Sequence, residues 1–314
     1  MDLTAPLAPG EIEAARRRIA GAALRTPLVP WRGGVADAWL KLECLQPVGS
    51  YKIRGATNAL KARLEAGERI EAIVTASAGN FGQAIVAAAK ALGLPAIVHV
   101  PDHAARVKVD ALRAMGATVR EHAFDEWWAI LQTRQTGDAG AFFHPVCERE
   151  VIAGAATIGS EIVEDLPEVD ALLVPVGGGG LACGIAMAVK ARRPACRLIA
   201  VETDTATPLK AALAAGEPVA VERTATFIDG MGSTRVLDEM WPLLRRLVDE
   251  VLVVAVAEVE AAIRTLAARH HVIAEGAGAA AVAALAQAPP GRNVAIVSGG
   301  NIDWAELHRI LAAA

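Results

Sequence analysis

The stretch ALLVPVGGGGLACG, residues 171–184, decides the fold class of this chain. An apolar run of the length of a buried strand ends in four consecutive glycines, and a helix pattern then continues to residue 192. Strand, glycine turn and helix in this order make one βα unit of an α/β protein. Four glycines lose more backbone entropy on folding than a tight turn requires, but they let backbone N–H groups approach an anion. We therefore predict that Gly177, Gly178, Gly179 and Gly180 bind a phosphate group.

The same loop allows a second interpretation. The pattern Gly177-x-Gly179-x-x-Ala182 fits the dinucleotide-binding fingerprint. Glu202 ends the next predicted strand, where an acid that binds a ribose is expected. An NAD-dependent oxidoreductase is therefore an alternative function for this chain.

The alternation of strands and helices extends outward from the loop in both directions. Apolar runs predict strands at 39–43, 72–75, 95–100, 116–120, 171–176, 198–202, 248–254 and 293–297. Helical periodicity covers 10–24, a helix from 53, a helix ending at 92, 103–115, 151–164, a helix ending at 192, 257–270 and 276–287. Because the strands are apolar throughout, we expect mainly parallel open sheets covered by helices. A chain of 314 residues exceeds one compact core, which favours two subdomains.

The composition of the chain limits the kinds of molecule that it is expected to bind. The chain has 31 Lys and Arg against 35 Asp and Glu, a formal net charge of −4, and no long block of one sign. This balance argues against nucleic acid or an anionic membrane and favours a small molecule. Four widely spaced cysteines indicate neither a disulfide framework nor a zinc site. The N-terminal residues lack the apolar core of a signal peptide, so we expect a soluble cytoplasmic protein.

A lysine with few acidic neighbours stands in KLECLQPVGSYKIRGATN, residues 41–58. Lys52 lies between Tyr51 and Ile53, directly before a predicted helix. Partial desolvation by such neighbours makes a lysine a usable nucleophile or base. Most lysines are solvated surface groups, however, so Lys52 alone is weak support for catalysis.

Two further turns follow buried strands. Ser77, Ala78, Gly79 and Asn80 connect a strand to a helix, where free N–H groups can hold a carboxylate and Asn80 can donate to a phenolate-like oxygen. An ordinary helix cap explains the same residues equally well. Ser298 follows another strand, at the carboxyl edge where α/β sheets bind ligands, although a structural turn is the commoner explanation.

Four segments in this order resemble the pyridoxal-phosphate enzymes of fold type II, and most closely the serine/threonine dehydratase and serine racemase group. They are KLECLQPVGSYKIRGA, ASAGNFGQA, PVGGGGLACG and VSGGN. The similarity covers nearly the whole chain. Supporting pieces are Pro101 with Lys108 and Gly116-Ala117, His144-Pro145, Val151 to Gly154, Asp229-Gly230, Trp241-Pro242 and Glu275.

The resemblance implies two domains with different roles. Residues 1–69 and 149–314 would form a large domain that binds pyridoxal 5'-phosphate, and residues 70–148 a small, mobile domain that binds substrate. Lys52 would hold the cofactor as a Schiff base, Asn80 would bind its ring hydroxyl, and Ser298 would meet its pyridine nitrogen. The remaining implied cofactor contacts are Tyr51, Gly177, Gly178, Gly179, Gly180, Leu181, Gly230 and Glu275.

The resemblance also implies an activity. A PLP-dependent lyase of this group releases a 2-oxo acid and ammonia from a β-hydroxy amino acid, with Lys52 removing the α-proton. Threonine or serine would be the substrate, with a bulkier phenylserine-type compound left open, and the enzyme would be a homodimer. Substrate contacts would be Ser77, Ala78, Gly79, Asn80, Phe81 and Ser233. A non-catalytic protein that binds the cofactor is a third alternative.

Several residues depart from the family pattern. Racemases of this group carry a serine where this chain has Ala78, so we predict elimination without racemisation. Phe81 stands where histidine is common. Trp127 and Trp128 suit either a bulky substrate or core packing. Glu202 and Ala206 match two positions of a divalent-metal site in some relatives, but Pro208 replaces its second carboxylate, so we predict no metal.

Overall fold

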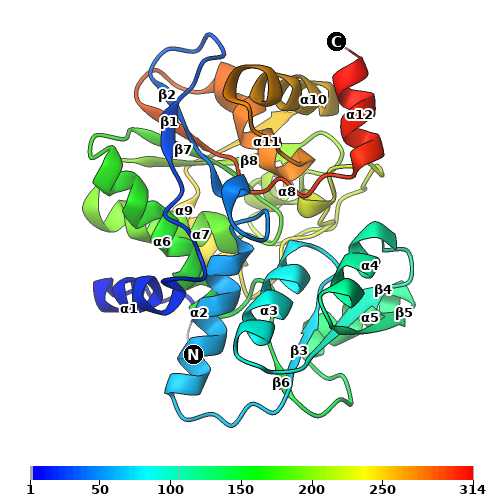
Figure 1. Ribbon diagram of the computed structural model, residues 1–314. Helices are drawn as coiled ribbons and strands as arrows, with labels where there is room; N and C mark the ends of the chain where they lie inside the picture. The colour runs from blue at the N-terminus through cyan, green and yellow to red at the C-terminus, as the bar shows by residue number, and fades with distance from the viewer. Residues whose placement is uncertain (1–2, 105, 314) are drawn as a thin grey trace.

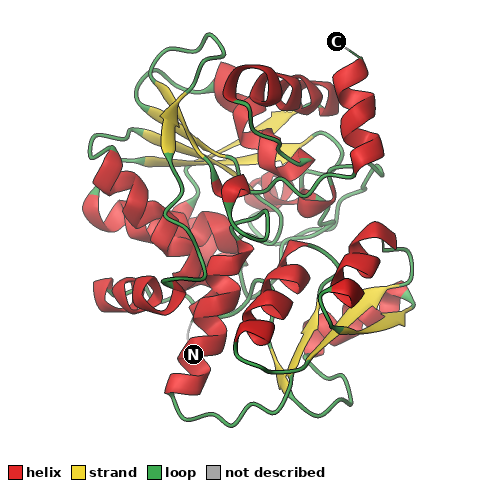
Figure 2. Cartoon of the chain, viewed as in Figure 1, coloured by secondary structure: helices red, strands yellow, loops and turns green. Residues whose placement is uncertain are grey.

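The computed structural model describes residues 3–104 and 106–313, in which two open β-sheets carry helices on both faces (Figure 1, Figure 2). The strands are β1 (Leu28–Pro30), β2 (Ala38–Lys41), β3 (Ile73–Ala76), β4 (Ala96–Pro101), β5 (Thr118–His122), β6 (Ala141–Phe142), β7 (Ala171–Pro175), β8 (Arg197–Thr203), β9 (Glu250–Val254) and β10 (Asn293–Ile296). The α-helices are α1 (Pro9–Ile19), α2 (Lys52–Glu65), α3 (Asn80–Ala91), α4 (Arg106–Ala114), α5 (Phe124–Thr133), α6 (Arg149–Asp165), α7 (Gly180–Arg192), α8 (Pro208–Ala215), α9 (Trp241–Leu247), α10 (Val256–Thr265), α11 (Gly276–Ala283) and α12 (Trp304–Ala312). None of the helices in these residues is long and apolar enough to cross a membrane.

The larger sheet has the strand order β1-β2-β10-β7-β8-β9, and every pair except β1–β2 is parallel. Successive side chains of a strand point to opposite faces, so the apolar run of β7 serves two cores. Leu172 and Val174 pack with α6 and α7 on one face. Leu173 packs with α10 and α11 on the other. The predicted parallel sheet covered on both faces is thereby confirmed.

The smaller sheet has the order β5-β4-β3-β6 and is parallel throughout. Helices α3 and α4 lie on one face and α5 on the other (Figure 1). This arrangement follows from right-handed crossovers, because the chain reverses direction across the sheet between β5 and β6. Small residues of α3, such as Ala84 and Ala89, let the helix pack closely on β4.

The chain passes between the two sheets at residues 66–72 and 143–148. Helix α2 precedes the first passage, and its Ile53, Ala56 and Leu60 belong to the core of the smaller sheet. Helix α6 follows the second passage and packs on α2 and α7. Residues of both sheets therefore meet around the start of α2. The division into two domains at 69/70 and 148/149, and the mobility of the smaller one, remain predictions.

Some elements differ from those predicted. The helix expected over 10–24 ends at Ile19, because Gly21 adopts a left-handed conformation with φ 79°. The helix expected over 257–270 changes to π-helix at Leu266–His270 and stops where His271 has φ 56°. Strands β1 and β6 were not predicted, since three and two residues are too short to show a strand pattern. Helices α5, α8, α9 and α12 were also missed.

Candidate active site

Lys52 is the first residue of α2 and lies where both sheets meet. The chain before it is tied to the end of β10, because Tyr51 N donates to the Ser298 carbonyl at 3.0 Å and Ser50 bridges to Gly299. The half-buried Lys52 amine donates to the Pro145 carbonyl at 3.0 Å. Its nitrogen lies 5.2 Å from the ring centroid of Tyr51 and 5.7 Å from that of Phe81. Among the described residues no carboxylate forms an ion pair with Lys52, so its amine is held by a neutral acceptor and two rings.

The glycine loop precedes α7, as predicted, and its residues need to be glycines for different reasons. Gly179 is the N-cap and has φ 89°, a conformation that other L-residues rarely adopt. A Cβ on Gly177 would lie 2.6 Å from the Gly230 carbonyl oxygen, and one on Gly178 would lie 2.5 Å from the Val146 side chain. The first-turn N–H groups of α7, a helix of 13 residues, have no partners within the helix. The loop therefore offers N–H donors and a positive helix end to an anion.

Asn80 begins α3, and both ends of its side-chain amide are engaged. Its Nδ2 donates to Glu275 Oε1 at 2.6 Å, and its Oδ1 accepts from Asn301 Nδ2 at 2.8 Å. Asn301 also donates to the Val48 carbonyl, next to the Lys52 loop. The amide can still donate its second Nδ2 hydrogen. Asn301 carries no predicted role, although it directly follows Ser298, Gly299 and Gly300 in the sequence.

Ser298 and Glu275 lie side by side across the start of α11. Glu275 N donates to the Gly299 carbonyl at 3.0 Å, and the Ser298 hydroxyl is 3.4 Å from the Ala277 carbonyl. This long contact leaves the buried hydroxyl available to another acceptor or donor. Burial raises the pKa of Glu275 to about 7, and the nearby positive charge of Lys108 opposes that shift.

The predicted cofactor residues are thus linked by contacts into one region. Lys52 reaches Pro145, its neighbour Val146 touches Gly178, and Gly177 approaches Gly230. A Cβ on Gly230 would in turn lie 2.9 Å from Ala277. Leu181 is buried at the start of α7, and the Tyr51 ring packs with the core of the larger sheet.

The predicted substrate residues divide into two groups. Ser77 to Phe81 surround the N-terminus of α3, where Gly79 is the N-cap. A Cβ on Gly79 would meet no atom within 4 Å, and its φ of −96° suits any residue, so open space rather than strain borders the backbone there. Phe81 is buried in the core of the smaller sheet while its ring faces Lys52. Ser233 is different, because its hydroxyl donates to the Arg235 carbonyl at 2.6 Å within its own turn.

Two features for which the sequence allowed more than one role make structural contacts: the pair Trp127 and Trp128, and Glu202. Trp127 and Trp128 pack against Ile130, Leu131 and the end of β3, and Trp127 Nε1 donates to the His99 carbonyl. Their core-packing interpretation is therefore the one observed. Glu202 accepts Leu209 N at 2.7 Å and Lys210 N at 2.9 Å, so its carboxylate caps α8. Within residues 3–104 and 106–313, no cluster of three or more His, Cys, Asp or Glu is placed to hold a metal ion.

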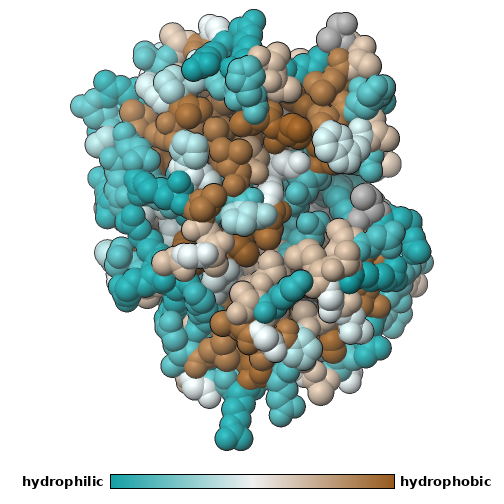
Figure 3. All heavy atoms as spheres, viewed as in Figure 1, coloured by the Kyte–Doolittle hydropathy of each residue, from teal (hydrophilic) through white to brown (hydrophobic). Residues whose placement is uncertain are grey.

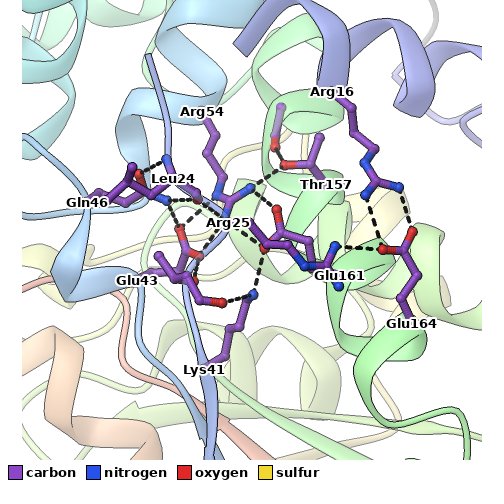
Figure 4. A network of polar contacts seen from close by, with 12 residues as sticks. Arg16, Leu24, Arg25, Lys41, Glu43, Gln46, Arg54, Thr157, Glu161 and Glu164 are labelled. Atoms are coloured by element: carbon purple, nitrogen blue, oxygen red, sulfur yellow. Dashed lines mark hydrogen bonds and ion pairs between the residues drawn. The ribbon is translucent and has the colours of Figure 1, made fainter. Parts of the chain in front are cut away.

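A buried ionic network that the sequence did not predict lies beneath α2 (Figure 4). Arg54, two residues after Lys52, is 1% exposed and binds both Glu43 and Glu161 through its guanidinium. Lys41 donates to Glu161 Oε2 at 2.6 Å and to the Thr26 carbonyl. Burial opposes the charge of Arg54, but the carboxylates of Glu43 and Glu161 outweigh it and raise its pKa. The network joins β2, the 3₁₀-helix Glu43–Leu45, α2 and α6 at the base of the site.

The donor groups fit pyridoxal phosphate. A lysine amine suits its aldehyde, and the N–H groups of the glycine loop suit its phosphate. The free hydrogen of Asn80 and the hydroxyl of Ser298 suit the two polar atoms of its ring. A Cβ on Gly79, the residue directly before Asn80, would meet no atom within 4 Å.

Comparisons with known proteins support the same cofactor. Residues 19–299 match the family model described as pyridoxal-phosphate dependent enzyme. The chain is 40% identical over 280 residues to an L-threonine ammonia-lyase of Thermotoga maritima, covering 88% of this chain and 70% of that protein. It is 35% identical to a catabolic L-threonine dehydratase of Escherichia coli, covering 97% of this chain and 96% of that protein. The structure of maize serine racemase is similar with a TM-score of 0.86 and 31% identity, covering 97% of this chain and 96% of that one. The chain therefore belongs to the pyridoxal-phosphate dependent enzymes.

Proposed function

We propose that this enzyme is a dehydratase, or ammonia-lyase, which converts a β-hydroxy amino acid to a 2-oxo acid and ammonia. Threonine or serine is the first choice of substrate, and a bulkier analogue stays open. The observation that carries the proposal is the placement of Lys52 between the Pro145 carbonyl and two aromatic rings, beside the glycine loop. Relatives named L-threonine ammonia-lyase or dehydratase support the same substrate class. The NAD interpretation is set aside, since Glu202 caps α8 and the family requires a different cofactor.

When bound, pyridoxal phosphate supplies an electrophilic carbon for the substrate amine and a ring that withdraws electrons from the α-carbon. Lys52 would hold the cofactor through its amine, and that amine would be free to act as a base while substrate is bound. That amine would accept the α-proton, and the β-hydroxyl would take up a proton and leave as water. Ser298 would offer a neutral hydroxyl to the ring nitrogen, which would keep the ring a weak electron sink and favour prompt loss of the β-substituent.

The chain offers the substrate carboxylate a place at the start of α3. The first-turn N–H groups of this helix have no helical partners, and space is open beside Gly79. We assign the carboxylate to the backbone of residues 77–80 and the wall of the substrate pocket to Phe81. Ser233 stays a proposed contact only, because its hydroxyl is used within its own turn.

The function is tested with purified protein and pyridoxal phosphate. Borohydride reduction is expected to fix a pyridoxyl group on the peptide that contains Lys52, as read by mass spectrometry. A screen of β-hydroxy amino acids for oxo-acid release is expected to give turnover with threonine or serine. A pyridoxyl group on another lysine contradicts the proposed site, and a labelled Lys52 without any turnover points to a non-catalytic binding protein.

Ala78 leads to a prediction about stereochemistry. Its methyl group cannot donate a proton to the face opposite Lys52, so wild-type protein given L-serine is expected to form pyruvate without measurable D-serine. Chiral chromatography of the reaction mixture measures both products. Ala78→Ser supplies a hydroxyl at this position and is expected to form more D-serine than wild type. Rapid D-serine formation by wild type is the result that refutes this prediction.

We also infer a homodimer, as the family resemblance implies. Figure 3 shows apolar side chains gathered over the half of the molecule that contains the larger sheet. Trp304 is 76% exposed and Ile273 43% exposed, which supports a surface for a second copy. A cytoplasmic location likewise stays a prediction.

A further inference from the structure

The segment that carries the acceptor of Lys52 is the connector, residues 144–148, which joins the smaller sheet to α6. It begins directly after a fixed point, because Phe143 N donates to the Val74 carbonyl at 2.7 Å and Thr75 Oγ1 donates to the Phe143 carbonyl at 2.8 Å. It ends at Glu148, and α6 starts at the next residue, Arg149. Its conformation between these two points decides where its backbone groups face.

The side chain of His144 fixes the conformation of the connector through hydrogen bonds. His144 is 2% exposed, and its Nδ1 accepts Val146 N at 3.1 Å and Cys147 N at 2.8 Å. Pro145, which lies between His144 and Val146 in the sequence, has no backbone N–H to donate. Glu148 Oε1 closes the turn from the other end by accepting His144 N at 2.6 Å. The imidazole therefore satisfies two backbone donors, that of buried Cys147 and that of half-buried Val146.

The connector presents groups to both halves of the site. The Pro145 carbonyl accepts the Lys52 amine at 3.0 Å. The Val146 side chain occupies the space beside Gly178 and touches Gly180. A different conformation of the connector would therefore move both the Pro145 carbonyl, which accepts the Lys52 amine, and the Val146 side chain, which packs beside the glycine loop.

The charge state of the imidazole fits this role. Two N–H groups on Nδ1 require that this nitrogen carry no proton, which places the single proton on Nε2. Burial lowers the pKa of His144 to about 3, and the positive charges of Arg134 and Lys52 act in the same direction. His144 is therefore neutral, and its Nδ1 remains an acceptor at the pH of any ordinary assay.

We propose that His144 is a positioning residue for Lys52, whose Nδ1 shapes the connector so that the Pro145 carbonyl faces the lysine amine and Val146 supports the glycine loop. The proposal rests on the function proposed above. It assigns His144 no contact with substrate and no proton transfer.

Two replacements separate the acceptor from the bulk of the ring. His144→Asn places an amide oxygen close to the position of Nδ1, whereas His144→Leu fills similar space without an acceptor. Apo-protein is mixed with pyridoxal phosphate, and the rate and Kd of cofactor capture are followed by absorbance. Borohydride and mass spectrometry then locate the captured cofactor. Near-UV circular dichroism and thermal unfolding of the apo-proteins report folding.

We expect the asparagine variant to capture the cofactor within about 3-fold of wild type. We expect the leucine variant to be slower and weaker by about 10-fold or more, because the N–H groups of Val146 and of buried Cys147 lose their acceptor. If the leucine variant does not fold, His144→Gln replaces it, since its amide oxygen lies near the position of Nε2. His99→Leu is the matched control, a buried histidine of β4 outside the connector, and is expected to capture the cofactor like wild type.

Different outcomes test the role of His144 and the function proposed for the enzyme. Equal capture by folded asparagine and leucine variants, or an equal loss in His99→Leu, overturns the role of His144 while Lys52 stays labelled in wild type. Failure of wild type itself to hold the cofactor on Lys52 removes the proposed function and this inference with it.

Discussion

Replacement of Lys52 by alanine is expected to lower kcat for oxo-acid release by about 10⁴-fold or more, because one amine both holds the cofactor and accepts the α-proton. The variant keeps the core contacts of α2, since Ile53, Ala56 and Leu60 are unchanged. We therefore expect it to fold and to bind pyridoxal phosphate without a covalent bond. Steady-state kinetics and borohydride labelling measure the two effects separately.

Lys61 provides the matched control on the same helix. Its amine donates to the Arg18 carbonyl at 2.6 Å, away from the site. Lys61→Ala is expected to retain kcat within about 2-fold, as is usual for a lysine that touches no reacting group. Activity of Lys52→Ala above a hundredth of the wild-type value, with Lys61→Ala unaffected, disproves the role assigned to Lys52.

The second large effect is on stability. Arg54→Leu is expected to lower the free energy of unfolding of the apo-protein by about 3–5 kcal/mol, as removal of one partner from a buried ion pair does. Its guanidinium binds Glu43 and Glu161, both buried, and among the described residues leucine leaves Glu161 paired with Lys41 and Glu43 without an ion-pair partner. Urea denaturation followed by circular dichroism measures the change.

Arg25→Leu tests whether burial is the cause. Arg25 also pairs with two carboxylates, at 2.6 Å to Glu164 and 2.5 Å to Asp165, but its side chain is 44% exposed. Exposed pairs contribute little, so we expect a loss within about 1 kcal/mol. Equal losses in the two variants mean that burial of the Arg54 network does not govern its contribution.

The parts of the site that the sequence predicted are those in which backbone geometry demands a particular residue type. Gly179 needs a left-handed conformation, and Gly177 and Gly178 lie too close to Gly230 and Val146 for a side chain. Such demands show in the sequence as a run of glycines. Lys52 became predictable for another reason, because its segment and three others stand in the order of a known family.

The parts that were missed depend on contacts between distant residues. Nothing near Arg54 in the sequence shows that Glu161, 107 positions away, binds it. The capping of α8 by Glu202 was hidden in the same way, because an acid at the end of a strand fits a ribose, a metal or a helix N-terminus equally well. His144 was visible as part of a motif, but its two hydrogen bonds follow from the fold of the connector.

The buried network beneath α2 limits how this sequence can change. Lys41, Glu43, Arg54 and Glu161 carry two positive and two negative charges, and none of the four is open to solvent that could screen a mismatch. A substitution that alters the charge at one of them needs a compensating substitution at another. In related or redesigned sequences, these four positions should therefore vary together, although they are spread from residue 41 to residue 161.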